Sequence, residues 1–272
     1  MKLEPHFSKR LDLGIKLAKS DAQVAVAQRL RYRVFHEELG AAADAVTLET
    51  KRDQDRFDEI CDHLLVTRAR TETSNPELCI DDDEEVVGTY RMLRQSIAKE
   101  NGGFYSQSEF DVEPLLARKS DLSFLELGRS CVLAQYRGTP VIELLWQGIW
   151  NYVRHHKVDA MFGCASFDGT DPECHADTLS FLGHHTKLPD EWHARAHDQH
   201  YIDMKRKPAD AIDCRKAMLS LPPLIKGYLR LGSYIGEGAV IDKAFNTIDV
   251  LVVLPISSIN PRYFAHFGAP TN

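Results

Sequence analysis

The first clear element in the chain is an amphipathic helix predicted for residues 21–40. Its apolar positions lie three or four residues apart, the spacing of one helix face: Val24, Ala27, Leu30 and Val34. Asp21 stands where a helix cap belongs, and Gly40 stands where a helix ends. Because Arg31 and Phe35 are four residues apart, we expect them to share a face of this helix.

The segments that follow have the apolar, β-branched composition of strands, separated by polar loops. The strand candidates are residues 63–70, 84–94, 125–133, 159–167, 199–207 and 248–256, and the first two read as an antiparallel hairpin. Short helices are expected within residues 109–119 and 177–185, whereas residues 221–236 are apolar and glycine-rich. This order predicts an α/β or α+β fold with one mixed sheet flanked by helices. No linker divides the chain, so we expect a single domain over residues 1–272 with its core at about 21–267.

A second helix is predicted from Thr139, which suits the N-cap position, with Pro140 as its first residue. Apolar residues occupy two of its faces, so it should be buried on both sides: Val141, Leu144, Leu145, Gly148 and Tyr152 on one, and Ile142, Trp146, Ile149 and Val153 on the other. Its N-terminus follows a strand directly and is preceded by Gly138, an arrangement that can bind phosphate through backbone N–H groups. A plain strand-to-helix connection is the alternative.

The strand before this turn carries two charged residues, Glu126 and Arg129, with Gly128 between them. Residues three apart in a regular strand face opposite sides, but a glycine inside a strand often marks a bulge. A bulge could bring both charges to one side and splay this strand from its neighbour, giving a V-shaped strand pair. The alternative is a buried ion pair with a structural role.

Composition and charge narrow the function classes. The net charge is −7 and no basic run stands out, which argues against a nucleic-acid partner. No segment has the length of a signal peptide core or a membrane-spanning helix, so a cytoplasmic protein is expected, with peripheral contact to the inner face of the membrane left open.

The cysteines and histidines offer two further chemistries. The six cysteines are scattered without a C-x-x-C pair, so reduced and mostly packed thiols are expected, with a Cys–His nucleophile as the alternative. His193 and His197 have the i, i+4 spacing of zinc ligands on a helix, but H-E-x-x-H is absent and surface histidines are the commoner reading.

Several motifs resemble known acyltransferase families. Gln135, Gly138 and Pro140 are similar to the phosphate-binding turn of GNAT-fold N-acyltransferases, although Pro140 replaces the usual Gly or Ala and removes one N–H donor. R-x-x-x-F, D-x-x-D, G-x-x-R and E-x-x-R resemble acyl-homoserine-lactone synthases, but residues 41–43 lack the expected tryptophan, which argues against an S-adenosylmethionine substrate.

Most of the chain, roughly residues 24–267, resembles the ornithine N-acyltransferases of ornithine-lipid synthesis. Six segments in the same order carry the resemblance: RYRVFHEELGA, DRFDEICDHLLV, VVGTYRMLR, ELGRSCV, YRGTPVIELLWQGIWNY and LPPLIKGYLRLGSYIG. The resemblance implies a GNAT-like fold and transfer of a 3-hydroxy fatty acyl group from acyl carrier protein to the α-amine of L-ornithine. It implies no bound cofactor, because the acyl donor arrives on the phosphopantetheine arm of its carrier.

The resemblance also assigns roles to residues. Glu126 is the candidate base, directly or through a water, with Arg129 beside it. Binding of the acceptor falls to Arg31, Phe35, Asp55, Asp58 and Arg91, although the arginines could instead pair with the aspartates. Binding of the acyl donor falls to Val132, Leu133, Gln135, Arg137, Gly138 and Thr139, with a backbone N–H near Val132 or Leu133 polarising the thioester.

Two other functions stay open at this point. The same fold could acylate another amino acid or make an acyl-homoserine lactone, or it could bind acyl carrier protein or lipid without turnover. An acidic carrier needs a local basic patch on this acidic chain, and residues 205–207 and Arg215 are candidates.

Overall fold

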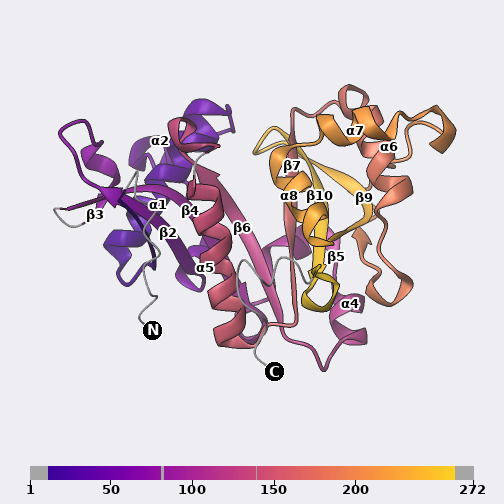
Figure 1. Ribbon diagram of the computed structural model, residues 1–272, viewed down its shortest axis with the longest axis horizontal. Helices are drawn as coiled ribbons and strands as arrows, with labels where there is room; N and C mark the ends of the chain where they lie inside the picture. Colours follow the sequence, from indigo (N-terminus) through magenta and orange to yellow (C-terminus); the bar gives the residue numbers. More distant parts are fainter. Residues whose placement is uncertain (1–11, 81–82, 139, 261–272) are drawn as a thin grey trace. The chain divides into compact units, whose positions relative to one another are not determined.

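The computed structural model describes residues 12–80, 83–138 and 140–260, and the chain divides into two compact units (Figure 1). Unit 1 contains Met1–Asn101 and Leu127–Lys157, and unit 2 contains Gly102–Glu126 and Val158–Asn272. The strand β6 (Phe124–Val132) therefore begins in unit 2 and ends in unit 1. The expectation of a single domain with a core at residues 21–267 stays a prediction, and residues 261–267 lie outside the described residues.

The sheet of unit 1 contains the antiparallel pair predicted for residues 63–70 and 84–94. Its strand order is β1 (Leu13–Leu17), β2 (Asp62–Ala69), β4 (Glu84–Arg94) and then β6, with β3 (Cys79–Ile80) also paired to β4. β1, β2 and β4 run antiparallel, in a register that places Leu64 opposite Tyr90. The predicted strands 63–70 and 84–94 and their pairing are thus confirmed, whereas β1 was missed.

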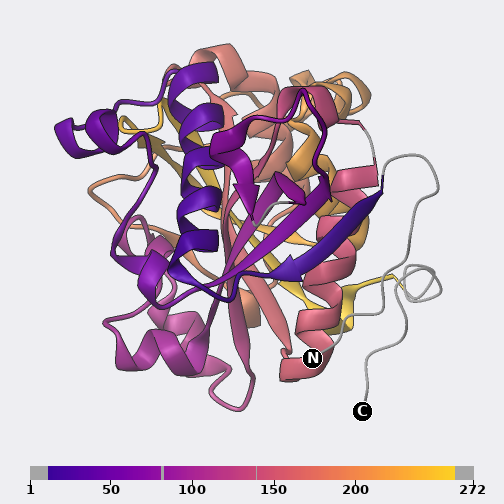
Figure 2. The same ribbon diagram turned by 90° about the vertical axis from the view of Figure 1, so that its left-hand side faces the viewer.

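Helices cover both faces of this sheet, which Figure 2 shows from the side of unit 1. α5 (Pro140–His156) packs on the face that carries Leu64, because a Cβ on Gly148 would lie 2.8 Å from that side chain. α1 (Asp21–Tyr32) lies against β4 on the face of His63 and Arg91. Two shorter helices are α2 (Ala45–Thr50) and α3 (Gln95–Glu100).

The two predicted helices form with small corrections. Ser20, not Asp21, caps α1 by accepting a bond from Gln23 N–H, and the helix continues as the π-helix η1 (Arg33–Glu38) before Gly40 at φ 75°. α5 begins at Pro140 as predicted. On its second face Ile149 and Val153 are buried as predicted, whereas Ile142 is 40% exposed.

The sheet of unit 2 is mixed. The first three residues of β6 pair in parallel with β7 (Ala160–Asp168), from Phe124↔Ala160 to Glu126↔Phe162. The order then continues through β10 (Thr247–Pro255), β9 (Tyr234–Asp242), β8 (Arg195–Ala196) and β5 (Phe110–Asp111). The helices of this unit are α4 (Glu113–Arg118), α6 (Ala176–His185), α7 (Cys214–Ser220) and α8 (Pro223–Leu231).

These units confirm the predicted fold class, a mixed sheet with helices on its faces. The strand predicted for residues 199–207 is wrong: Ile202 makes one isolated bridge to Ala239, and the lysine and arginine that follow turn toward acidic partners. Residues 221–236 form α8 and the start of β9. No helix among the described residues combines the length and apolar character needed to cross a bilayer.

Candidate active site

The carboxylate of Asp58 in unit 1 is 6% exposed and has several hydrogen-bond donors. Arg31 binds it with both guanidinium ends, Nη1 to Oδ1 at 2.8 Å and Nη2 to Oδ2 at 2.6 Å. Arg91 Nη1 donates to Oδ1 at 3.0 Å and Gln28 Nε2 to Oδ2 at 3.0 Å. These four donors, with a fifth from the backbone N–H of Asp55, compensate for the removal of the carboxylate from water.

Two further aspartates extend this cluster and bring in Arg129 from β6. Asp53 Oδ2 lies 2.8 Å from Arg31 Nε and 3.3 Å from Arg129 Nε. Asp55 accepts from Arg91 at 2.7 Å and from Arg129 Nη2 at 3.1 Å. We call these six side chains the acid–arginine network: Arg31, Asp53, Asp55, Asp58, Arg91 and Arg129.

The D-x-x-D spacing has a local cause. Asp55 caps the 3-10 turn η2 (Arg56–Glu59) by accepting from Phe57 N–H at 2.9 Å, and Asp58 accepts from Asp55 N–H at 3.2 Å. This reciprocal capping box fixes the two carboxylates side by side. They are therefore part of a folded turn that faces α1.

The network sets the protonation of its members. Burial opposes ionisation of Asp58, but the hydrogen bonds and charges of Arg31 and Arg91 hold its pKa well below the usual range. Burial likewise raises the pKa of Asp53, yet a bond with His36 and the charges of Arg129 and Arg31 bring it down to about 2. These two aspartates are thus carboxylates near neutral pH and unsuited to accept a proton.

The structure brings together most of the residues predicted to bind the acceptor. Arg31, Arg91, Asp55 and Asp58 pair with one another, which confirms the pairing alternative; their contact with an acceptor stays a prediction. Phe35 lies in η1, where the change from α- to π-helical spacing alters its alignment with α1. Sequence reasoning missed Asp53, although its place two residues before Asp55 was a usable signal.

Arg129 reaches the network from an irregular point in β6. Its φ is 51°, a left-handed conformation that is unusual for a non-glycine residue within a strand. The left-handed residue of this strand is Arg129 and not Gly128, and the bulge predicted at Gly128 stays a prediction. The guanidinium interactions with Asp53 and Asp55 offset the cost of that conformation.

Glu126, the candidate base, lies in unit 2 and is 6% exposed. Its Oε2 accepts from Tyr105 N–H at 2.9 Å, and its Oε1 accepts from Ser106 N–H at 2.8 Å and from the Ser106 hydroxyl. These bonds give the carboxylate one orientation and hold the turn η4 (Tyr105–Ser108) against the strand. The role of Glu126 as a base stays a prediction.

The turn predicted to bind the acyl donor is described except for Thr139, which lies outside the described residues. Gly138 has φ 78° and open space where a Cβ would stand, as a close backbone approach requires. Leu133 N–H donates to Val87 O at 3.0 Å, so that amide is committed to the sheet and the carbonyl-polarising prediction rests on Val132. Arg137 pairs with Glu38 and donates to Val132 O at 3.0 Å, whereas Gln135 is exposed.

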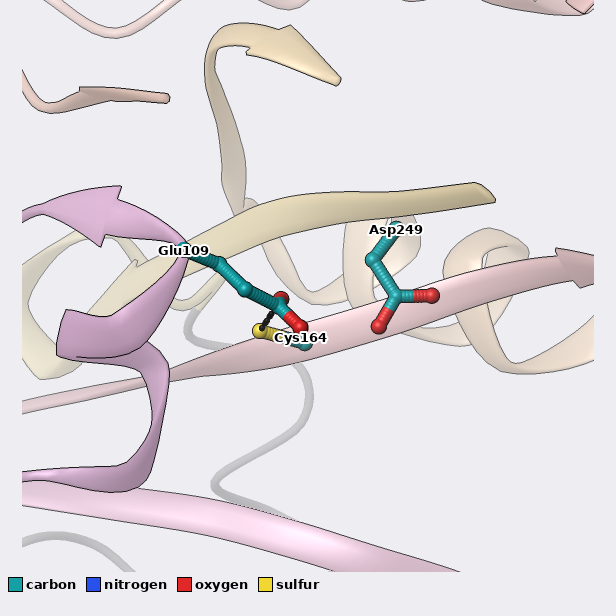
Figure 3. Close-up of side chains that lie close together, drawn as sticks. All are labelled: Glu109, Cys164 and Asp249. Atoms are coloured by element: carbon teal, nitrogen blue, oxygen red, sulfur yellow. Dashed lines mark hydrogen bonds between the residues drawn. The ribbon is translucent and has the colours of Figure 1, made fainter. Parts of the chain in front are cut away.

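The cysteine alternative finds little support. None of the six cysteines takes part in a disulfide. Figure 3 shows Cys164 between Glu109 and Asp249 on neighbouring elements of unit 2, with its Sγ donating to Glu109 at 3.4 Å. Burial and the nearby carboxylates raise the pKa of Cys164 well above its usual value, which keeps the thiol protonated and non-nucleophilic. The Cys–His contact in this unit joins exposed Cys214 to His185 at 3.4 Å.

The helix that the zinc alternative requires at His193 and His197 does not form. Residues 193 and 197 flank the short strand β8 instead of lying on a helix. His193 Nε2 lies 2.9 Å from Glu237 Oε2, and His197 Nε2 lies 2.9 Å from Gln107 O, so the two rings have separate partners.

Comparison with known proteins places this geometry in a family. Residues 30–147 match the family model described as "Acetyltransferase (GNAT) domain". The chain is 50% identical over 256 residues to the L-ornithine N(alpha)-acyltransferase of Agrobacterium fabrum, covering 94% of this chain and 85% of that protein. The protein of the same name from Brucella abortus is 48% identical over 260 residues, covering 96% of this chain and 90% of the relative.

A solved structure agrees with the fold. FeeM, an N-acyl amino acid synthase from uncultured soil microbes, aligns with a TM-score of 0.53 at 11% identity, covering 95% of this chain and all of that one. At this identity the likeness supports the fold alone.

Proposed function

Because the chain belongs to the family of L-ornithine N(alpha)-acyltransferases, we propose that it forms an amide between a fatty acyl group and the α-amine of L-ornithine. The donor is a 3-hydroxyacyl thioester on acyl carrier protein, and the product is lyso-ornithine lipid. The amine nitrogen attacks the thioester carbonyl, a C–N bond forms, the C–S bond breaks, and the carrier thiol leaves with a proton.

The observation that carries this proposal is the pairing of opposite charges at the more exposed edge of the acid–arginine network. The side chain of Asp55 is 24% exposed and that of Arg129 is 12% exposed, whereas those of Arg31, Asp58 and Arg91 are 4% exposed or less. An amino acid with a second ammonium group matches such a pair, since its carboxylate can bind the guanidinium and an ammonium can bind the aspartate.

The other proposed roles follow the same chemistry. Glu126 would receive the proton of the α-ammonium, directly or through a water, and its hydrogen bonds from Tyr105 and Ser106 hold the carboxylate in place. The turn at Gly138 would receive the single phosphate of the phosphopantetheine arm, and Arg137 would exchange Glu38 for that phosphate. The carrier protein and an inner-membrane surface are the proposed partners.

An acyl-transfer assay tests the proposal. The full chain is mixed with 3-hydroxyacyl carrier protein, or with the corresponding coenzyme A thioester, and with ornithine, lysine, glutamine or glycine in parallel. Mass spectrometry of the products then identifies acceptor and donor together. Acylated ornithine from the carrier thioester is the expected result; another acylated amine would reassign the acceptor, and an intact thioester would indicate a binding module.

Two variants separate the roles in the same assay. Asp55→Asn should raise KM for ornithine about tenfold with a smaller change in kcat, because it removes ground-state binding of the ammonium. Glu126→Gln should lower kcat about 100-fold or more, as loss of a general base does. Glu49→Gln, an exposed acidic residue of unit 1, is the matched control and should change neither constant.

A further inference from the structure

The helix α7 exposes large apolar side chains beside positive charges. Of its seven residues only Ala217 is buried, and this residue faces the body of unit 2. Leu219 is 69% exposed and Met218 is 50% exposed. Arg215 lies three and four positions before them, so the cation and the two apolar side chains share a helix face.

The neighbouring helix adds charge to the same surface. Lys226 of α8 donates from Nζ to the carbonyl oxygen of Leu219 at 3.0 Å, which brings its ammonium to the C-terminal end of α7. Arg230 follows one turn later on α8 and is exposed. We call this surface the α7 patch; it comprises Arg215, Lys216, Met218, Leu219, Lys226 and Arg230.

The α7 patch lies in a segment whose charge is opposite to that of the chain. Residues 204–232 contain seven lysines and arginines and two aspartates, while the net charge of the whole protein is −7. Two of those cations are neutralised by ion pairs, Arg206 with Glu173 and Lys207 with Asp177. The cations of the α7 patch therefore stand out from an acidic surface, which concentrates positive potential there.

We propose that the α7 patch docks the protein onto an anionic lipid bilayer. Met218 and Leu219 insert at the boundary between headgroups and acyl chains, and Arg215, Lys216, Lys226 and Arg230 bind the anionic headgroups. A bilayer fits both features, because it offers negative charge and apolar depth side by side. This inference rests on the proposed function in one respect: the single-chain product is an amphiphile, and release beside a bilayer spares it a path through water.

Vesicle co-sedimentation of the full chain tests this docking independently of turnover. Vesicles of equimolar phosphatidylcholine and phosphatidylglycerol are compared with vesicles of phosphatidylcholine alone. We expect the protein to sediment with the anionic vesicles and to be released as the salt concentration rises. The reason is that the Debye length shortens from about 8 Å at physiological ionic strength to about 3 Å at 1 M, which weakens the attraction between the cations and the headgroups.

Matched variants locate the surface. Arg215→Gln with Lys216→Gln should weaken partitioning roughly 30-fold, about fivefold for each charge. Leu219→Ser should weaken it roughly tenfold through lost apolar contact. The controls are Lys19→Gln with Lys99→Gln for charge and Leu48→Ser for apolar exposure; these exposed residues of unit 1 should leave partitioning unchanged.

The remaining outcomes either refute membrane docking at the α7 patch or distinguish its failure from a failure of the proposed function. Absence of sedimentation with anionic vesicles, or equal losses in the controls, refutes docking at the α7 patch. A patch variant that binds vesicles normally but has a raised KM for acyl carrier protein would assign the patch to the carrier instead. Normal vesicle binding by a chain that transfers no acyl group would refute the proposed function while leaving the docking surface intact.

Discussion

Replacement of Asp53 with asparagine probes the acid–arginine network at the carboxylate that sequence reasoning missed. The substitution keeps the size of the side chain and removes its negative charge. Asp53 Oδ2 lies 2.8 Å from Arg31 Nε and 3.3 Å from Arg129 Nε, so both guanidinium groups lose a partner. Because Arg31 is 1% exposed, water cannot replace the lost charge there, and the free energy of unfolding should fall.

The size of the effect follows from the shift in acidity. A carboxyl group whose pKa falls from 3.8 in the unfolded chain to about 2 in the folded protein contributes about 2 kcal/mol of stability when ionised. The side chain is 8% exposed, so screening by solvent reduces this figure little. Asp53→Asn should thus destabilise by about 2 kcal/mol, or roughly 6 °C in Tm for a chain of this size.

The pH dependence distinguishes this cause from a general loss of packing. Because the pKa of Asp53 is lower in the folded protein, its contribution to the free energy of unfolding is complete above the unfolded value of 3.8. This contribution is lost as the pH falls toward 2. The difference between wild type and Asp53→Asn in urea unfolding should therefore be complete at about pH 7 and fall to about half at pH 3. Glu49→Gln, on the surface of the same unit, should show neither the loss nor its pH dependence.

A difference that stays constant from neutral to acid pH would refute this reasoning, since it would mean that the loss is one of shape and not of charge. A destabilisation below about 0.5 kcal/mol would contradict it as well, because that is the range of ordinary surface substitutions.

Three further predictions concern packing, the donor turn and the thiols. Gly148→Ala should lower the free energy of unfolding by about 1–3 kcal/mol, because its Cβ would stand 2.3 Å from a side chain of β1; unchanged urea unfolding would contradict this. Arg137→Ala should raise KM for the acyl-carrier donor about tenfold, whereas Glu38→Gln should not raise it, because it only releases the arginine; equal effects would argue against a phosphate role. Under native conditions iodoacetamide should modify exposed Cys174 well before Cys164, whose pKa burial raises; peptide mass spectrometry at graded times checks this order.

Much of the fold could be predicted because the deciding signals are local. Apolar, β-branched composition predicted β2 and β4, and the Thr-Pro pair after Gly138 predicted where α5 begins. Failures occurred where tertiary contacts override local pattern. Residues 199–207 look like a strand, yet the segment pairs with β9 through an isolated bridge between Ile202 and Ala239.

The candidate site shows the same division. Motif spacing found Arg31, Asp55, Asp58 and Arg91 together with Arg129, but it could not say whether they would pair with one another or face a substrate. The motif likewise did not distinguish the backbone N–H of Val132 from that of Leu133 as the donor that polarises the thioester. The bond from Leu133 N–H to Val87 O separates them, and strand pairing of this kind is not visible in a local segment.

By itself the sequence determined the mixed-sheet fold class, the acyltransferase motifs and the reduced cysteines, because each depends on periodicity, spacing or composition along the chain. The tertiary structure alone decided which charges are matched. Asp53 and Asp58 come from one loop, while the arginines that pair with them come from α1, β4 and β6. The lowered pKa values of the two carboxylates result from these contacts between distant segments. Electrostatic energy depends on distance and burial in three dimensions, and neither quantity can be read from the order of residues.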